Sequence, residues 1–308
     1  MKIKKVLAMF LAMGLIVGAV GCANNGSTSG EFPNKSIEII VPYAAGGGTD
    51  IAARAMADSV KNHISEPLVV VNKTGAGGAV GMGEGAQATA DGYKVTTITV
   101  ELTTLPPQGL LQFTNEDFKP IIQFNAEPAA LTVKADAPWN TLEEFAEYAK
   151  ANPGDLKVGN SGIGAIWHLA ALAFEKEIDT TFNHIPYEGA NPAVTALLGG
   201  HIEAVTVSPA EVSAQVRAGE LKILGIMDHE RSPKYSDVPT FIEEGYDVTV
   251  GTWRGFAVPK NTPADVVKIL EDAFTKGANE QAFKDFMDNQ GLNIALLGSS
   301  DFESRIAA

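Results

Sequence analysis

A glycine-rich loop follows the first apolar run of the chain and has the composition of an anion-binding site. The apolar residues 37–41 lead to three glycines at 46–48, and Thr49 and Asp50 then precede apolar residues at helical spacing. The first N–H groups of a helix lack intrahelical partners and together carry about half a positive charge. Because the loop contains no lysine or arginine, it predicts an anion site made of backbone donors, in which Thr49 or Asp50 caps the helix.

Two more glycine-rich loops lie at predicted strand ends, at residues 73–78 (KTGAGG) and 159–166 (GNSGIGAI). Either loop alone could be a tight turn, because glycine adopts the backbone angles that turns require. Three such loops in one chain favour a ligand site instead, since ligands of open α/β sheets bind at the carboxyl ends of the strands.

Signatures of an enzyme are weak in this sequence. Gly75, Gly77 and Gly81 miss the dinucleotide-binding spacing by one residue. Ser161 lacks the closing glycine of a nucleophile elbow, and the histidines lie in separate segments without metal-ligand spacing. We therefore expect no catalysis, no cofactor and no metal. An exported enzyme acting on a small organic acid is the alternative, with Asp50 and Glu101 as its titratable groups.

The N-terminus has the layout of a bacterial lipoprotein signal. Three lysines precede an apolar stretch that ends on small residues before Cys22, the single cysteine of the chain. Residues 1–21 are the predicted signal peptide, Cys22 the lipidation site and 22–31 a polar tether. A free N-terminal membrane helix is the alternative. The folded body is expected to be extracytoplasmic, either anchored by lipid at the outer face of the cytoplasmic membrane or in the periplasm.

The charge of the chain excludes some classes of partner. The formal net charge is −14, with 23 basic and 37 acidic residues, and removal of the three signal lysines leaves −17 (20 against 37). Phosphate backbones require a basic surface, so no nucleic-acid partner is expected. An acidic surface also repels anions at long range, so an anion site must work through local donors. We expect a monomer.

Strand and helix patterns alternate along the chain, which predicts an α/β fold with largely parallel sheets. Two such units suggest two lobes, 32–133 plus 251–308 and 134–250, with chain crossings near 131–136 and 248–253. The clearest predicted strands are 37–41, 67–72, 93–100, 129–135, 203–207 and 221–227, and the clearest helices are 50–62, 78–88, 263–277 and 279–289.

Several ordered motifs resemble those of the tripartite tricarboxylate transporter receptors, also called Bug proteins. The matching stretches are VPYAAGGGTDIAAR, VVNKTGAGG, GNSGIGAIWHLA, IPYEGANPAVTALLGGHIEA, DVPTFIEEGYDV and GTWRGFAVPKNTP. The resemblance extends from about Phe32 to the end of the chain. It implies a two-lobed fold like that of type II periplasmic binding proteins, in which each lobe is a mostly parallel sheet flanked by helices and a hinge joins the lobes.

The resemblance also implies a set of ligand-binding positions, in which backbone N–H groups at helix N-termini and bridging waters hold a small carboxylate. Two residues depart from the family pattern, because Ala165 stands where a serine is usual and Glu203 where an aspartate is usual. The implied positions are Ala45, Gly46, Gly47, Thr49 and Asp50 in the first loop, Ala76 and Gly77 in the second, Ser161, Gly162, Ala165 and Ile166 in the third, and Ser208 after the strand 203–207.

The function implied by the resemblance is solute capture for import. A loaded receptor of this family presents its solute, a small organic acid or amino acid, to a membrane permease of one large and one small subunit. A solute sensor that signals to a kinase is a further alternative. Glu101, at the end of the strand 93–100, would favour a solute that also carries an ammonium group, unless it points to solvent. Arg254 is expected to form a surface or inter-lobe ion pair, and a cationic contact with the solute is its alternative role.

Overall fold

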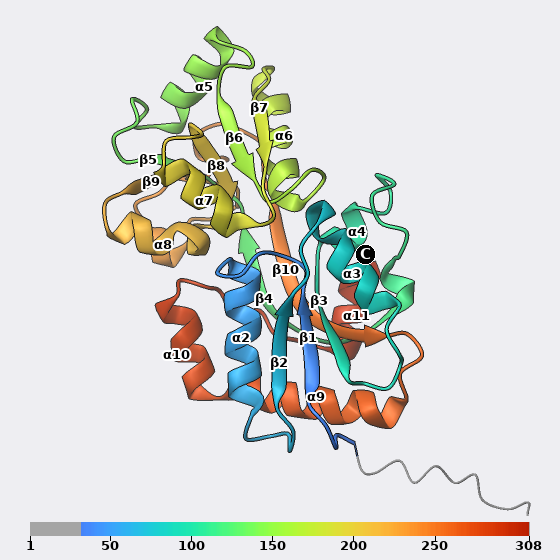
Figure 1. Cartoon of the computed structure of the whole chain (residues 1–308). Helices are drawn as coiled ribbons and strands as arrows, with labels where there is room; N and C mark the ends of the chain where they lie inside the picture. The colour runs from blue at the N-terminus through green and yellow to red at the C-terminus, as the bar shows by residue number, and fades with distance from the viewer. Residues whose placement is uncertain (1–31, 308) are drawn as a thin grey trace, which may run out of the picture. The chain divides into compact units, whose positions relative to one another are not determined.

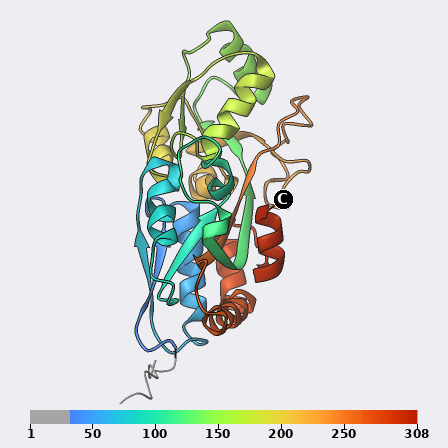
Figure 2. The same cartoon turned by 90° about the vertical axis from the view of Figure 1, so that its right-hand side faces the viewer.

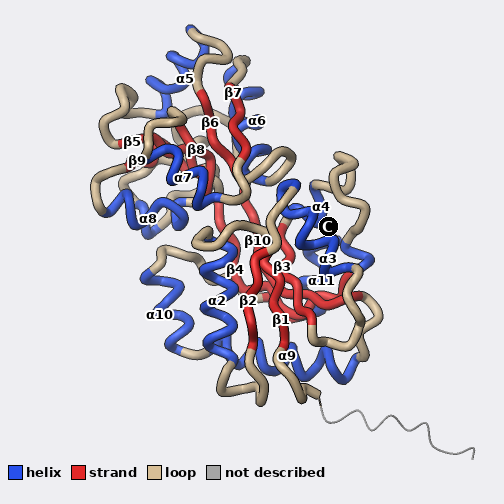
Figure 3. The backbone as a smooth tube through the Cα atoms, viewed as in Figure 1, coloured by secondary structure: helices blue, strands red, loops and turns tan. Residues whose placement is uncertain are grey.

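Runs rich in isoleucine, valine and threonine form the inner strands of two separate sheets (Figure 3). The structure is a computed structural model that describes residues 32–307. The predicted signal peptide 1–21, the lipidation site Cys22 and the tether 22–31 lie outside the described residues. Within residues 32–307, no helix is both long enough and apolar enough to cross a membrane.

The first sheet combines parallel and antiparallel strands. Its strands are β1 (Ile37–Val41), β2 (Leu68–Asn72), β3 (Lys94–Thr99), β4 (Phe118–Pro128), β10 (Gly251–Pro259) and β11 (Leu297–Gly298). Their order across the sheet is β11-β4-β10-β3-β1-β2 (Figure 1). β1 pairs in parallel with β2 and β3, whereas β10 is antiparallel to β3 and β4. Parallel β-α-β connections bring the carboxyl ends of β1 and β3 to the same edge of the sheet.

Helices pack on both faces of the first sheet (Figure 2). α2 (Gly48–Val60) contacts α9 (Ala264–Asn279) and α10 (Gln281–Asn289), whereas α3 (Ala79–Ala86) and α11 (Ser299–Ala307) share a separate core with β3 and β10. The short helix α4 (Glu101–Thr104) directly follows β3. In α9, Val266, Leu270, Ala273 and Phe274 are buried at spacings of three and four residues, so one apolar stripe faces the sheet.

The second sheet also mixes strand directions and has its own core. Its strands are β5 (Ala130–Lys134), β6 (Lys157–Asn160), β7 (Asn183–Pro186), β8 (Ala204–Val207) and β9 (Leu221–Ile226), in the order β7-β6-β8-β5-β9. β6 is parallel to β7 and β8, and β5 is antiparallel to β8 and β9. Its helices are α5 (Leu142–Ala151), α6 (Ile166–Ile178), α7 (Ala190–Leu198) and α8 (Pro209–Arg217).

Two hydrogen-bonded crossings connect the sheets. β4 passes into β5 through Ala129, and the segment 227–250 leads from β9 to β10. Ala129 donates to the carbonyl of Val250 at 2.8 Å and accepts from the N–H of Met227 at 2.8 Å. The first crossing therefore comes slightly before the predicted range 131–136, because β5 already belongs to the second sheet.

The α/β class is confirmed, but three details differ from the sequence prediction. Neither sheet is mostly parallel, because β10 and β5 enter antiparallel to their neighbours. β4 was missed because Pro120, Asn125 and Glu127 interrupt its apolar pattern. α8 was missed as well, and it carries Glu211, a residue of the site described below.

Candidate functional site

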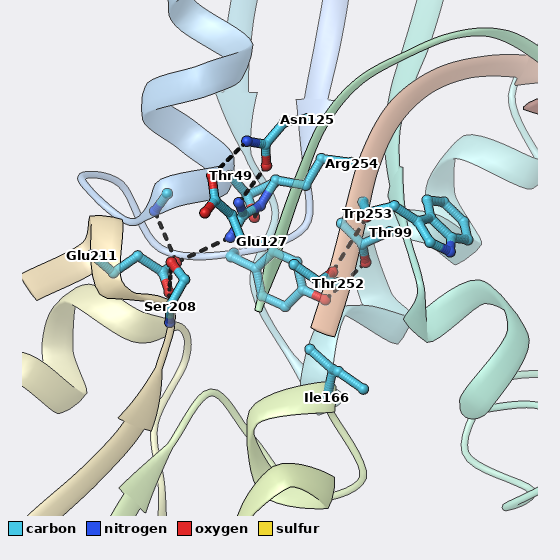
Figure 4. Close-up of polar contacts among 12 residues, drawn as sticks. Thr49, Thr99, Asn125, Glu127, Ile166, Ser208, Glu211, Thr252, Trp253 and Arg254 are labelled. Atoms are coloured by element: carbon cyan, nitrogen blue, oxygen red, sulfur yellow. Dashed lines mark hydrogen bonds and ion pairs between the residues drawn. The ribbon is translucent and has the colours of Figure 1, made fainter. Parts of the chain in front are cut away.

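Helix N-termini from both sheets meet at one small cavity (Figure 4). The first turn of α2 comes from the first sheet, and the first turns of α6 and α8 come from the second. The cavity has a volume of about 20 Å³, roughly the space of a single water. Because the cavity is this small, polar groups that belong to the two sheets contact each other directly around it.

The N-terminus of α2 binds a carboxylate from the other sheet. α2 begins at Gly48 after an extended Gly47, and the Gly48 N–H donates to Oε1 of Glu211 at 3.0 Å. A Cβ at position 48 would lie 2.8 Å from that oxygen and 3.0 Å from Nη2 of Arg254. Glycine is thus required here because the carboxylate and the guanidinium approach the backbone closely.

Glu211 is held by the cap of its own helix. The backbone N–H and the hydroxyl of Ser208 donate to Oε2 of Glu211 at 2.9 and 3.0 Å, which forms a capping box at the start of α8. The second oxygen, Oε1, stays available for Gly48 of the first sheet. The cap therefore fixes the carboxylate in the direction of α2.

Arg254 completes this end of the cavity with a buried ion pair. The residue is 1% exposed, and its Nη2 lies 3.3 Å from Oε1 of Glu211. Its Nε donates to the Thr49 hydroxyl at 3.0 Å and its Nη1 to Oδ1 of Asn125 at 2.6 Å. The pair joins the two sheets, as expected for an inter-lobe ion pair, but it is not at the surface.

A second acid, Glu127, lies behind Arg254 on β4. It accepts from Nδ2 of Asn125 at 2.8 Å and from the Asn293 backbone at 2.7 Å. Burial raises the pKa of Glu127 to about 7, although the Arg254 charge and these hydrogen bonds oppose that shift. The carboxyl is therefore close to half-protonated at neutral pH.

The N-terminus of α6 has the mirror arrangement, with a carboxylate from the first sheet. The Ile166 N–H donates to Oε1 of Glu101 at 2.9 Å. The hydroxyl of Thr99 donates to Oε2 of Glu101, and the Tyr43 hydroxyl lies 3.1 Å from Oγ1 of Thr99. Burial, reinforced by the Glu101 charge, raises the pKa of Tyr43 well above its usual range. Glu101 is only 2% exposed, so it does not point to solvent.

Comparison with known proteins identifies the family of this chain. Residues 52–307 match the family described as tripartite tricarboxylate transporter family receptor. The chain belongs to this family. A UPF0065 protein of Bordetella pertussis is 33% identical over 264 residues, which cover 85% of this chain and 82% of the relative.

Solved structures of similar receptors share the fold. A TctC solute binding protein from Polaromonas, solved with no ligand, is 47% identical with a TM-score of 0.65, and the match covers 90% of this chain and 95% of that one. The periplasmic binding protein BugD is 30% identical with a TM-score of 0.86, over 90% and 94%. MatC from Rhodopseudomonas palustris, with bound malate, is 26% identical with a TM-score of 0.81, over 85% and 91%.

Five of the predicted binding positions of this receptor line the cavity. They belong to the first turn of α2, the end of β3 and the start of α6, and Ser161 is notable among them. It is 4% exposed, and its hydroxyl has no hydrogen-bond partner among the described residues. The five positions are Gly47, Thr49, Glu101, Ser161 and Ile166.

The other predicted positions of the receptor lie outside the cavity lining. Gly77 and Gly162 bring the second and third loops together, since a Cβ on Gly162 would lie 2.9 Å from Cα of Gly77. Ser208 acts as the helix cap described above. Those away from the lining are Ala45, Gly46 and Ala76, which are exposed, and Asp50, Gly77, Gly162, Ala165 and Ser208, which are buried.

Asp50 stabilises the first loop and is turned away from the cavity. Its carboxylate accepts from Nε of Arg54 at 3.0 Å, from Nδ2 of Asn72 at 2.9 Å and from the Gly46 N–H at 2.9 Å. Burial opposes its charge, but these hydrogen bonds hold the pKa of Asp50 below its usual range. Neither Thr49 nor Asp50 caps α2, because the helix begins at Gly48, two residues before the predicted start.

Sequence reasoning missed several lining residues. Gly48, Tyr43, Thr99 and Glu211 were not among the predicted positions. For Glu211 a local signal existed, because Ser208-Pro209-Ala210-Glu211 has the capping-box spacing with proline at the first helical position. Thr99 lies only two residues before Glu101, but no local signal places Tyr43 beside them, because that contact depends on the pairing of distant strands.

Proposed function

We propose that this receptor captures a small carboxylate-containing solute at the cavity where α2 and α6 meet. One observation carries the proposal, namely that both helix N-termini already bind carboxylates, through Gly48 and Ile166. Each position therefore has the geometry that a carboxylate needs. The bound malate of MatC, a receptor with the same fold, supports a solute of this class.

Closure of two lobes around the solute is part of the proposal. The lobes would be 32–133 plus 251–308 and 134–250, hinged at the crossings beside Ala129 and Val250. The Polaromonas receptor, at 47% identity, superposes less well than BugD at 30%, with TM-scores of 0.65 and 0.86. At such identity each sheet with its helices is expected to be conserved, so the contrast supports a difference in how the lobes are arranged.

Anchoring and delivery complete the proposed function. Lipidated Cys22 would hold the folded body at the outer face of the cytoplasmic membrane, with residues 22–31 as the tether. The loaded receptor would then pass its solute to a permease of one large and one small subunit. Mass spectrometry of the mature N-terminus tests the anchor: a diacylated Cys22 supports it, and an unmodified terminus further along the chain contradicts it.

Identification of the bound solute tests the proposed function. Protein purified from its natural host is denatured, and the released small molecules are analysed by mass spectrometry. The identified compound is then titrated into solute-free protein by calorimetry, while turnover is followed in parallel. We expect a small acid that binds with micromolar or tighter affinity and is recovered unchanged. Conversion of the compound to a product would favour the enzyme alternative instead.

A further inference from the structure

The α6 end of the cavity points to the chemical class of the solute. The Ile166 N–H of α6 binds Glu101 of the first sheet at 2.9 Å, and Glu101 is 2% exposed. We propose that Glu101 selects a solute that carries an ammonium group as well as a carboxylate, such as an amino acid. The inference rests on the proposed function and specifies the class of solute that this site accepts.

The charges around the cavity differ between its two ends. Glu211 is neutralised by Arg254, whose Nη2 lies 3.3 Å from its carboxylate. The groups that donate to Glu101 are neutral, among them the Ile166 N–H and the Thr99 hydroxyl, and no described basic side chain forms an ion pair with it. The cavity lining therefore carries one carboxylate without a basic counterpart.

Entry of a solute must separate Glu101 from Ile166. The cavity of about 20 Å³ has room for roughly one water, so a solute of several heavy atoms requires the facing surfaces to move apart. The Glu101–Ile166 hydrogen bond joins the two sheets, as the Gly48–Glu211 bond does, and it breaks when the α6 end of the cavity opens. A carboxylate and a helix N-terminus, both buried, then each need a new partner.

A solute with both charges satisfies both groups and also neutralises Glu101. Its carboxylate would accept from the Ile166 N–H, and its ammonium would lie against Glu101. A plain dicarboxylate would also fill the helix N-terminus, but it would leave Oε1 of Glu101 without a partner and place a second negative charge beside it. The solute takes the place of Glu101 at the Ile166 N–H, and the displaced Glu101 then selects the solute by its charge.

A free donor on the same wall suits the carboxylate of such a solute. The Ser161 hydroxyl is buried beside the start of α6 and has no partner among the described residues. Together with the Ile166 N–H it gives two donors for one carboxylate, whereas Glu101 remains the acceptor for the ammonium. The α6 end therefore offers separate positions for the two charged groups.

Matched pairs of solutes test the proposal. The full-length receptor is unfolded in guanidinium, dialysed to remove any solute and refolded. Calorimetry then compares amino acids with the 2-hydroxy acids of the same carbon skeleton, from alanine and lactate through aspartate and malate to glutamate and 2-hydroxyglutarate. In the wild type, the amino acid that binds best should bind at least about tenfold more tightly than its hydroxy analogue.

Three variants make the test specific to Glu101. Glu101→Gln keeps an acceptor for Ile166 but removes the charge, and it should abolish the preference for the amino acid. Glu101→Asp keeps the charge and should retain the preference at lower affinity. Glu143→Gln, on an exposed face of α5, should behave like the wild type. Thermal unfolding of each variant confirms that it is folded before its binding is measured.

The outcomes separate this proposal from the function on which it rests. Equal or tighter binding of the hydroxy acid to the wild type overturns the selection and leaves the carboxylate receptor intact. An unchanged preference in folded Glu101→Gln also overturns it. If neither class binds at millimolar concentration, but the compound released from the native protein is a neutral molecule, the proposed carboxylate receptor fails together with the inference.

Discussion

The N-termini of α2 and α6 each bind a carboxylate through a backbone N–H, but the two carboxylates are held by different further partners. At α2, Glu211 binds Gly48 and is also fixed by Arg254 and by the cap of its own helix. At α6, Glu101 binds Ile166 with only a threonine hydroxyl as a further partner. Both carboxylates are buried. Glu211 lies in α8, beside the second sheet, and contacts α2 of the first, whereas Glu101 lies in α4, beside the first sheet, and contacts α6 of the second.

Because of this difference, the contact at the α2 end is structural, whereas the contact at the α6 end can be exchanged for a solute. A buried carboxylate paired with a guanidinium is costly to expose alone, because removal of either partner leaves an uncompensated charge. A carboxylate held by neutral donors can exchange them for similar donors of a solute at smaller cost. We therefore infer that the α2 end fixes the geometry of the closed cavity and that the α6 end responds to the solute.

The largest expected effect follows from breaking the ion pair at the α2 end. Arg254→Met leaves Glu211 buried without its cation, so the free energy of unfolding should fall by about 3–5 kcal/mol. Urea unfolding followed by circular dichroism measures the loss. Arg231→Met is the control, because its partner Glu243 is exposed, and it should cost far less than Arg254→Met. Equal losses in both variants would contradict the structural role of Arg254.

The next largest effect is a pH dependence of the unfolding free energy, which arises from Glu127 behind Arg254. Burial raises the pKa of Glu127 from 4.5 to about 7, so the fold favours the protonated acid. Its stabilisation is complete below pH 4.5 and is lost as the pH rises to about 7, on the order of 3 kcal/mol in total. Unfolding free energies of wild type and Glu127→Gln, measured from pH 4 to 8, should diverge by this amount. Parallel curves would mean that burial does not raise the pKa of Glu127.

A smaller effect is expected from adding one methyl group at the α2 N-terminus. Gly48→Ala places a Cβ at 2.8 Å from Glu211 and 3.0 Å from Arg254, so it should destabilise the protein by about 1–3 kcal/mol. Gly83→Ala, within α3, meets only Phe113 at 3.5 Å, and it should be neutral or stabilising because alanine favours helix. A neutral Gly48→Ala would show that the contact across the sheets is loose.

The smallest change in stability is expected from a substitution of Glu101 at the α6 end. Glu101→Gln keeps an oxygen that accepts from the Ile166 N–H, so unfolding should change by less than about 1 kcal/mol. Chemical denaturation in the absence of solute measures it. A loss as large as that of Arg254→Met would make the two ends equivalent and remove the distinction between them.

Much of the fold could be predicted from local sequence patterns. Apolar runs such as 37–41 and glycine-rich loops before helices have strong local signals, so β1, α2 and α6 were anticipated. β4 was not, because its Asn125 and Glu127 are buried polar residues whose partners, Arg254 and Asn293, lie far along the chain. Strand direction was also misjudged, since antiparallel pairing of β10 and β5 depends on where the chain crosses between the sheets.

The site was predicted in part for the same reason. Loop composition, which is local, predicted that Gly47, Thr49 and Ile166 belong to the site, and all three line the cavity. The carboxylate that binds each helix comes from the opposite sheet, and neither pairing has a signal in the sequence around Gly48 or Ile166. The binding roles of the predicted positions, including the exposed Ala45, Gly46 and Ala76, stay predictions.

Backbone amide NMR during solute titration tests the central distinction most directly. Signals of Gly48 and Ile166 are followed in labelled, solute-free receptor as the compound released from the native protein is added. We expect a large, saturable shift at Ile166, whose N–H changes its acceptor, and a much smaller shift at Gly48, whose acceptor remains Glu211. A saturating titration in which Ile166 does not move, or in which Gly48 moves more, would contradict it.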